Sequence, residues 1–137
     1  MNKWQINQSY QQLAGKVLIS IFILATLFHV LVILEILPNE IVWGGNITFK
    51  EELYIFESIS IAINLLFLFI VLAYTGRIKS RIKASIFKWL MWLMAVVFLI
   101  NTLGNLLAKT STETLIFTPV TFVSAVCCLV LLSKEKS

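Results

Sequence analysis

The sequence predicts an all-α fold: a polytopic integral membrane protein whose four transmembrane helices form an antiparallel bundle. Three observations lead to this prediction. First, 59% of the 137 residues are apolar and only 13% are charged, against about 25% charged residues in a typical soluble domain. Second, four apolar segments are each long enough to cross a bilayer, and third, the basic residues gather on one side of them. Charge, glycine, proline and cysteine are too scarce for a disordered tail, a collagen, a nucleic-acid-binding arm or a disulfide scaffold.

A bilayer is crossed by roughly 20 helical residues, and four segments meet that length. We expect helices at about 17–37, 53–74, 86–107 and 115–132, within a single domain that spans residues 1–137. The connections are short and polar, so sequential helices should pack antiparallel. Residues 1–16 are polar with spaced aromatic rings, and we expect them to form a cytoplasmic interfacial segment. The first apolar run has about 21 residues, longer than the roughly 7–15 of a signal peptide, and we expect it to be retained.

The distribution of basic residues predicts the orientation of the bundle. Nine of the eleven lysines and arginines lie before the first helix, between the second and third, or after the fourth. They are Lys3, Lys16, Arg77, Lys79, Arg81, Lys83, Lys88, Lys134 and Lys136. Only Lys50 and Lys109 lie on the opposite side. The positive-inside rule therefore predicts that both chain ends and the middle connection are cytoplasmic, in a bacterial inner membrane or a plasma membrane.

The fourth apolar segment has a start signal and a break signal. Thr110 and Glu113 have the spacing of a capping box ahead of the apolar run. Pro119 falls inside the predicted helix, where it lacks an N–H and its ring clashes with the preceding turn. We therefore expect a bend or a loosened backbone near Thr118.

Polar side chains gather in the half of the predicted bundle that faces away from the cytoplasm. Glu57, Ser60 and Asn64 are spaced to share one face of the second helix. The third and fourth helices carry polar pairs at helical spacing, and the first helix carries the single histidine. A carboxyl such as that of Glu57 costs several kcal/mol when it faces lipid, so we expect these side chains to point toward one another, with Trp43 in the outer connection as a lid. The candidate ligand-binding residues are His29, Trp43, Glu57, Asn64, Asn101, Asn105, Thr118 and Thr121.

A structural interpretation of these residues stands beside the functional one. Buried amides and hydroxyls hold membrane helices together at roughly 0.6 kcal/mol each, and this interpretation is preferred for the threonines. For the asparagines the two interpretations are level. An ionisable group inside a membrane is a functional hypothesis by default, so we interpret Glu57 as a protonatable group with His29 as its hydrogen-bonded partner.

The sequence predicts neither a cofactor nor a metal site. His29 is the only histidine, and one imidazole cannot build a typical zinc site by itself. Cys127 and Cys128 are adjacent rather than spaced as C-x-x-C, so we expect them to pack as small apolar side chains. No phosphate-binding loop, nucleophile elbow or dinucleotide fingerprint is present. The net charge of +4 follows from the topology and does not call for a nucleic acid as partner.

Three functions remain open at this point. Ranked first is binding or transport of a small polar or amphipathic ligand, a proton or a cation at an outward-facing pocket around Glu57. Second is a structural or accessory role in which the polar cluster only holds the helices together. Third is an intramembrane enzyme that acts on a lipid or isoprenoid, with Glu57 and His29 as acid and base. The expected partners are the lipid bilayer and a small-molecule or lipid ligand, and a homo-oligomer is left open because four short helices enclose little volume.

Overall fold

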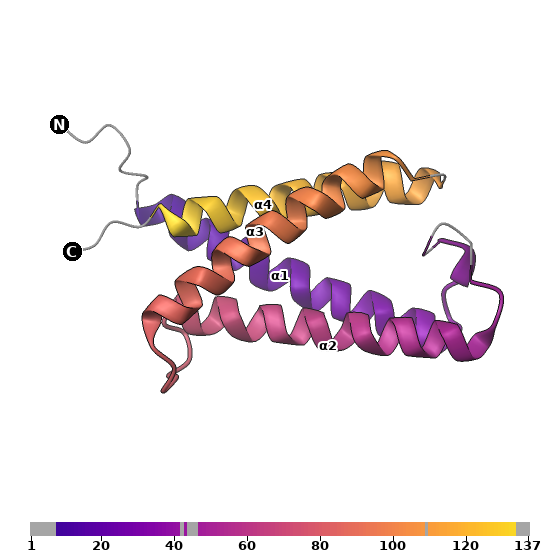
Figure 1. Ribbon diagram of the computed structural model, residues 1–137, viewed down its shortest axis with the longest axis horizontal. Coiled ribbons are helices and arrows are strands. Elements are labelled where there is room, and N and C mark those ends of the chain that lie inside the picture. Colours follow the sequence, from indigo (N-terminus) through magenta and orange to yellow (C-terminus); the bar gives the residue numbers. More distant parts are fainter. Residues whose placement is uncertain (1–7, 42, 44–46, 109, 134–137) are drawn as a thin grey trace.

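The computed structural model describes residues 8–41, 43, 47–108 and 110–133. Its long helices are α1 (Gln8–Ile33), α2 (Lys50–Tyr74), α3 (Ala84–Leu106) and α4 (Thr118–Leu132). A 3-10 turn, η1 (Asn39–Ile41), follows α1, and a π-helical turn, η3 (Glu113–Phe117), leads into α4. Consecutive long helices run antiparallel, so the described part of the chain begins and ends at the same end of the molecule (Figure 1).

Four helical stretches are long and apolar enough to cross a membrane, which confirms the four predicted apolar helices. They are α1, α2, α3 and the continuous run of η3 with α4, and they span 26, 25, 23 and 20 residues. At 1.5 Å per residue the shortest is about 30 Å long, which is the thickness of a bilayer hydrocarbon core. Many large apolar side chains on all four helices face outward. An outer surface of this kind is what contact with lipid requires.

The first helix differs from its predicted boundaries. α1 begins at Gln8 rather than near residue 17, so the stretch expected at the interface as a separate segment is continuous with the long helix from Gln8 onward. Glutamine, leucine and alanine are good helix formers and no proline interrupts them, so the helix extends beyond its apolar part. It ends earlier than predicted, at Ile33, because Glu35 adopts a left-handed conformation (φ 58°). The N–H of Ile36 then bonds to the carbonyl of Leu31 at 3.0 Å, as in the Schellman motif that closes many helices.

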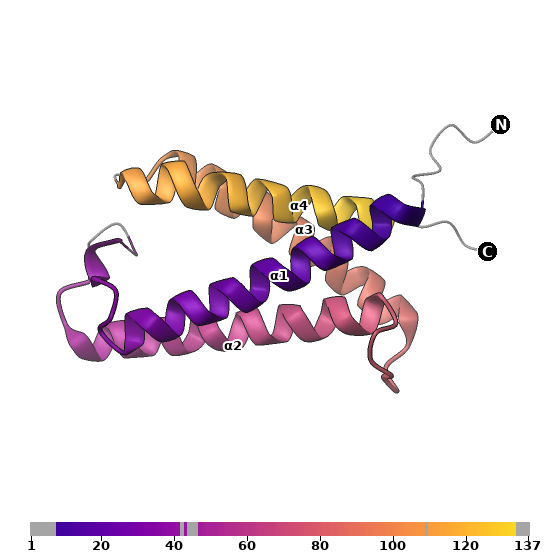
Figure 2. The ribbon, with the colours of Figure 1, turned by 180° about the vertical axis from the view of Figure 1, so that it is seen from behind.

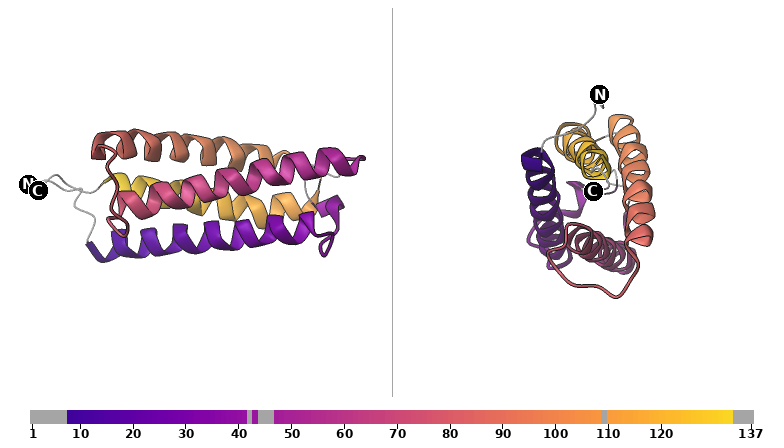
Figure 3. Two further views of the ribbon diagram at one scale, coloured as in Figure 1. Left: turned by 90° about the horizontal axis from the view of Figure 1, so that it is seen from below. Right: turned by 90° about the vertical axis from the view of Figure 1, so that its left-hand side faces the viewer.

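The four helices form two hairpins. α1 packs along α2, and α3 packs along α4, whereas α2 and α3 contact each other much less. In Figures 1 and 2, α3 begins near the end of α2 and crosses toward α4 as it proceeds. Contacts between α1 and α4 join the two hairpins, and the end-on view of Figure 3 shows the four helices arranged around a common axis.

The main apolar core lies in the half of the molecule that contains the described chain ends. All four helices contribute fully buried side chains to it. Where this core approaches the middle of the bundle, the rings of Phe22, Phe67 and Phe98 contact one another, with centroid separations of 5.6 to 5.8 Å. A smaller apolar cluster, built on Val32 and Leu53, lies toward the opposite end. The polar residues of the candidate site therefore lie between two apolar regions.

Charge separates the two ends of the molecule. We call the end with the start of α1 and the α2–α3 connection the basic end, and the end with the α1–α2 and α3–α4 connections the acidic end. The described carboxylates belong to the acidic end, and they are Glu35, Glu40, Glu51, Glu52, Glu57 and Glu113. The described cations of the basic end are Lys16, Arg77, Lys79, Arg81, Lys83 and Lys88.

The entry into α4 shows both predicted local signals. The Thr110 hydroxyl donates to Glu113 Oε2 at 2.6 Å and accepts from the Glu113 N–H at 3.3 Å, which is a form of capping box. The next five residues form η3, a π-helical turn that ends directly before Thr118 and Pro119. Proline cannot donate a helical hydrogen bond, and π-turns occur where the regular pattern is interrupted. The expected loosening of the backbone near Thr118 is therefore confirmed, but Pro119 lies in the first turn of α4 and not inside the helix as predicted.

Candidate functional site

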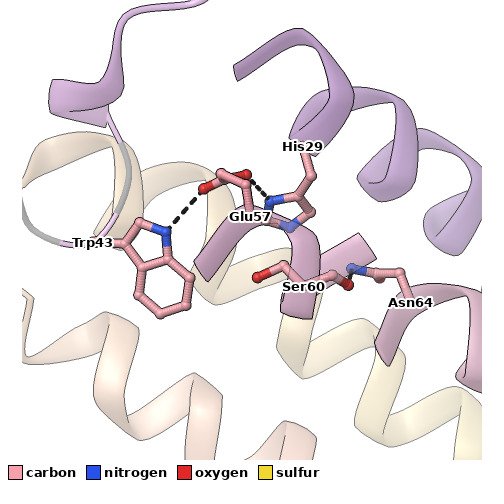
Figure 4. Close-up of polar contacts among 5 residues, drawn as sticks. All are labelled: His29, Trp43, Glu57, Ser60 and Asn64. Carbon is pink, nitrogen blue, oxygen red and sulfur yellow. Dashed lines mark hydrogen bonds and ion pairs between the residues drawn. The ribbon is translucent and has the colours of Figure 1, made fainter. Parts of the chain in front are cut away.

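Glu57 is the buried polar centre of the acidic end. It lies about 10 Å along α2 from the first residue of that helix, at 1.5 Å per residue, and its side chain is 0% exposed. It shares the inward face of α2 with Leu53 one turn before it, which explains why the chain carries it into the interior. A buried carboxyl needs hydrogen-bond partners, and both of its oxygens have one (Figure 4).

The first partner of Glu57 is the only histidine in the sequence. His29 Nδ1, on α1, lies 2.6 Å from Glu57 Oε2. The imidazole is partly exposed, at 19% of its side-chain surface, and its ring packs edge-on against Phe28 with centroids 5.5 Å apart. The sequence predicted this pair, and the geometry of α1 against α2 brings the two side chains together.

The short contact between His29 and Glu57 requires a shared proton. A nitrogen and an oxygen at 2.6 Å form a hydrogen bond only when one hydrogen lies between them, whether it belongs to the imidazole or to the carboxyl. The other carboxyl oxygen accepts from a group that can only donate, which leaves Oε2 as the oxygen that faces the proton. The pair is therefore a site at which one proton lies between an imidazole nitrogen and a carboxyl oxygen.

The second partner of Glu57 is Trp43, in the α1–α2 connection. Its indole N–H donates to Glu57 Oε1 at 2.9 Å, and its ring lies 5.0 Å from that of Phe56. Trp43 is 41% exposed and has a positive φ of 54°, which is strained for a bulky side chain. The predicted Trp43 lid therefore contacts the carboxylate it was expected to cover. Gly44 and Gly45, which follow Trp43 in this connection, lie outside the described residues.

The surroundings of Glu57 restrict the directions from which it can be reached. Val32 and Leu53 are buried one helical turn from His29 and Glu57, toward the acidic end. Toward the basic end, Phe67 follows Glu57 by ten residues, about 15 Å along α2, and belongs to the three-ring contact in the main core. The partly exposed groups next to the carboxylate are His29 and Trp43. Both hydrogen-bond partners of the carboxylate therefore reach the surface of the bundle.

A second polar group lies in the other hairpin. The hydroxyls of Thr102 and Thr121 are 3.0 Å apart, and the Asn105 amide lies 3.5 Å from the Thr121 hydroxyl. The Thr114 hydroxyl donates to the Asn105 carbonyl at 3.2 Å, and the Thr118 hydroxyl donates to a backbone carbonyl of η3 at 3.4 Å. The bonds among Thr102, Asn105, Thr114 and Thr121 join α3 to η3 and α4, whereas the Thr118 bond lies within the η3–α4 run.

The structure thus differs from the prediction of one polar cluster. Within the described ranges the polar groups of the two hairpins share no hydrogen bond, and a ring contact between Phe28 and Phe117, with centroids 5.5 Å apart, lies between α1 and η3 instead. The physical reason is the packing of α3. Because α3 contacts α4 far more than α2, its inward polar side chains meet those of α4.

Two asparagines do not reach Glu57. The Asn64 amide donates to the Ser60 carbonyl of its own helix at 2.9 Å, one to two turns from the carboxylate (Figure 4). Asn101 is exposed, and the expectation that it points into the cluster was wrong. Thr102 is buried on the inward face of α3. Adjacent residues of a helix point in directions about 100° apart, so Asn101, directly before Thr102, points outward.

Glu35 forms a separate surface link between α1 and α2. Lys50 Nζ donates to its two oxygens at 2.7 and 3.0 Å, and the Tyr54 hydroxyl donates to Oε1 at 3.1 Å. The hydrogen bond from Lys50 and then that from Tyr54 lower the pKa of the Glu35 carboxyl below its ordinary value. Glu35 is about half exposed, so it closes the hairpin at the surface and takes no part in the buried site.

Sequence reasoning missed three polar contributors: Tyr54, Thr102 and Thr114. Thr102 lies three residues before Asn105, and this i,i+3 spacing is the signal that places both on one face of α3. Among the described residues no three His, Cys, Asp or Glu side chains come together in a way that could hold a metal ion. Cys127 and Cys128 are both buried and unpaired in the main core, as expected of small apolar side chains.

Comparison with protein-family models, with curated proteins and with solved structures returns no match. The site is interpreted below from its own geometry.

Proposed function

We propose that the protein is a small integral membrane protein that binds a proton, or a small polar or cationic ligand, at Glu57. In this proposal both chain ends and the basic end are cytoplasmic, in a bacterial inner membrane or a plasma membrane, and the acidic end faces outward. The nine-to-two distribution of basic residues supports this orientation. The observation that carries the proposal is the complete burial of the Glu57 carboxyl, on an apolar helix, between an imidazole and an indole.

The chemistry of these three side chains supports the binding of positive charge. A buried carboxylate is stabilised by whatever cation or proton accompanies it, and here that role falls to the proton shared with His29. Trp43 and Phe56 add aromatic faces beside the carboxylate, and such faces attract organic cations. A small organic cation that replaces the shared proton would therefore find both a carboxylate and an aromatic wall.

The position of Trp43 supports opening from the acidic end. Its side chain comes from a connection rather than from a helix, it is 41% exposed, and its backbone is strained. Movement of this one side chain would uncover Glu57 Oε1. The contact of Phe22, Phe67 and Phe98 closes the other direction, so transport across the membrane would need a second conformation.

A pH-difference infrared experiment tests proton binding. In lipid nanodiscs the protonated carboxyl of Glu57 should give a C=O stretching band that appears on acidification and is lost in Glu57→Gln. Glutamine keeps an oxygen for Trp43 and an amide for His29, so the fold should survive. Glu52→Gln, which removes an exposed carboxyl from the same helix, is the matched control and should keep the band. An unchanged band in Glu57→Gln would contradict the proposal.

A fluorescence titration with tetramethylammonium tests cation binding. Trp43 is the indole in contact with Glu57, so binding should change an emission component that Trp43→Phe removes. Glu57→Gln should abolish the saturable change, while Glu52→Gln should leave it intact. A titration that stays linear in the wild type, or one that is equal in wild type and Glu57→Gln, would contradict cation binding at this carboxyl.

A structural role is the second candidate, and one observation favours it. Among the described residues no buried polar side-chain atom lacks a hydrogen-bond partner. A network that is complete in itself needs no ligand, and it is sufficient to hold helices together. This role predicts that Glu57→Gln changes the free energy of unfolding and leaves both the infrared and the fluorescence signals as they are in the wild type.

A further inference from the structure

A cavity lies at the basic end, at the opposite end of the helices from Glu57. It has a volume of about 310 Å³ and lies between the start of α1, the end of α2 and the end of α4. Small-molecule sites commonly measure about 300–1,000 Å³, so this cavity suits a small headgroup rather than a large ligand. The right-hand view of Figure 3 looks onto this end of the molecule.

One wall of the cavity is a single face of α1. Gln8, Gln11, Gln12 and Lys16 all line it, at the spacing that places residues on one side of a helix. Each glutamine amide offers two N–H donors and the lysine ammonium offers three. Gly15 lies in the same wall, where an added Cβ would already be 3.2 Å from a methyl group of α2. The wall is therefore rich in donors, and the glycine allows α1 to approach the end of α2 closely.

The facing wall comes from the end of α2. Tyr74, Thr75 and Arg77 line it, and the Tyr74 hydroxyl donates to the Leu131 carbonyl at 3.3 Å, which ties α2 to the end of α4. Gly76 adopts a left-handed conformation, φ 72°, that closes the helix. The Arg77 N–H then bonds back to a carbonyl of α2 at 2.9 Å. The helix cap thus fixes the backbone that presents the Arg77 guanidinium.

Among the described residues that line the cavity, Lys16 and Arg77 carry positive charge and none carries a carboxylate. Lys16 and Arg77 form no ion pair within the described ranges, and the carboxylates described there all belong to the acidic end. Lysine supplies a point charge for a phosphate, and arginine can bind two of its oxygens at once. We infer that this cavity binds a phosphate group, carried by an anionic lipid headgroup or present as free phosphate. Its place at the helix ends is where lipid headgroups meet a membrane protein.

Binding of phosphatidylglycerol to the detergent-purified full chain tests the inference, with phosphatidylcholine as the reference lipid. Native mass spectrometry should show phosphatidylglycerol bound more tightly than phosphatidylcholine. Lys16→Gln and Arg77→Gln should each weaken that binding about tenfold, because each removes charge-assisted hydrogen bonds. Both side chains are exposed, so neither change should disturb the fold, and circular dichroism verifies this.

Lys79→Gln and Lys83→Gln are the matched controls. Each removes one positive charge from the same end of the molecule, and neither residue lines the cavity. They should weaken phosphatidylglycerol binding less than about twofold if the cavity is the site. Equal weakening by the control and the cavity variants would overturn the inference, because the attraction would then be that of a diffuse charged surface.

A second arm distinguishes the two sources of the phosphate group. Inorganic phosphate, added as its sodium salt against sodium chloride, should compete with phosphatidylglycerol if the site recognises the phosphate itself. Tight lipid binding without such competition identifies the lipid headgroup as the ligand. Phosphatidylglycerol that binds no tighter than phosphatidylcholine, together with no effect of inorganic phosphate, would overturn the inference.

Discussion

Replacement of His29 by phenylalanine removes the one hydrogen-bond partner that Glu57 Oε2 has among the described residues. The carboxyl is 0% exposed, so water cannot replace the lost bond without opening the structure. Removal of one partner from a buried charged pair typically destabilises by about 3–5 kcal/mol. A neutral hydrogen bond between membrane helices is worth only about 0.6 kcal/mol on average and about 1.7 at most. The size of the loss therefore reports whether the pair holds charge.

A double-mutant cycle gives the interaction energy between His29 and Glu57, separated from the effects of each single substitution. Glu57→Leu leaves His29, which is partly exposed, and should cost about 1–2 kcal/mol. The combined variant has two apolar side chains that can pack together, and it should lie within about 1 kcal/mol of the wild type. The coupling energy between His29 and Glu57 is then at least about 3 kcal/mol.

Titration with sodium dodecyl sulfate in mixed micelles, followed by circular dichroism, measures these free energies of unfolding. The Thr102→Val and Thr121→Val pair is the matched control, since its hydroxyls are 3.0 Å apart and uncharged, and its coupling should be about 0.6 kcal/mol. A His29–Glu57 coupling no larger than that of the threonine pair would refute the reasoning.

Three smaller predictions concern the helix ends, and each is measured as a change in thermal stability. Gly76→Ala should destabilise by about 1 kcal/mol, since φ is 72° and alanine disfavours this conformation; no loss would mean that the cap is not formed. Thr110→Ala should cost about 1 kcal/mol through the lost bonds to Glu113, and an equal loss in Thr110→Ser would show that the hydroxyl is not the cause. At pH values above 4.5, the ordinary carboxyl pKa, Glu35→Gln should lower the melting temperature, because the hydrogen bond from Lys50 lowers the pKa of Glu35 in the folded state. That difference should vanish as the pH falls through the lowered pKa, and a pH-independent difference would contradict the assignment.

The four apolar helices could be predicted because hydropathy and length are local properties of the chain. The residues at which the helices begin and end could not be predicted as well from hydropathy and length. α1 begins at Gln8 because good helix formers extend a helix into polar sequence, where hydropathy gives no signal. It ends at Ile33 because Glu35 accepts a left-handed conformation that is unusual for a residue other than glycine.

The candidate site could be predicted in part. Depth in the predicted bundle placed His29 near Glu57, and its position in the outer connection placed Trp43 over them; the structure shows both contacts with Glu57. The same reasoning failed for Asn101, because a helical face can be assigned from sequence while the neighbour that it meets depends on the packing of α3 against α4. The cavity at the basic end was not predictable either, because it joins Lys16 to Arg77 through the tertiary packing of α1 against the end of α2.

The release of protons during tetramethylammonium binding is the most direct test of the Glu57 site. If the cation takes the place of the proton held between Glu57 and His29, addition of the salt to unbuffered protein should release up to one proton per chain, measured with a pH-indicator dye. Glu57→Gln should release none, while Glu52→Gln should behave as the wild type. Binding without proton release would contradict displacement of the shared proton, and equal release from wild type and Glu57→Gln would contradict Glu57 as its source.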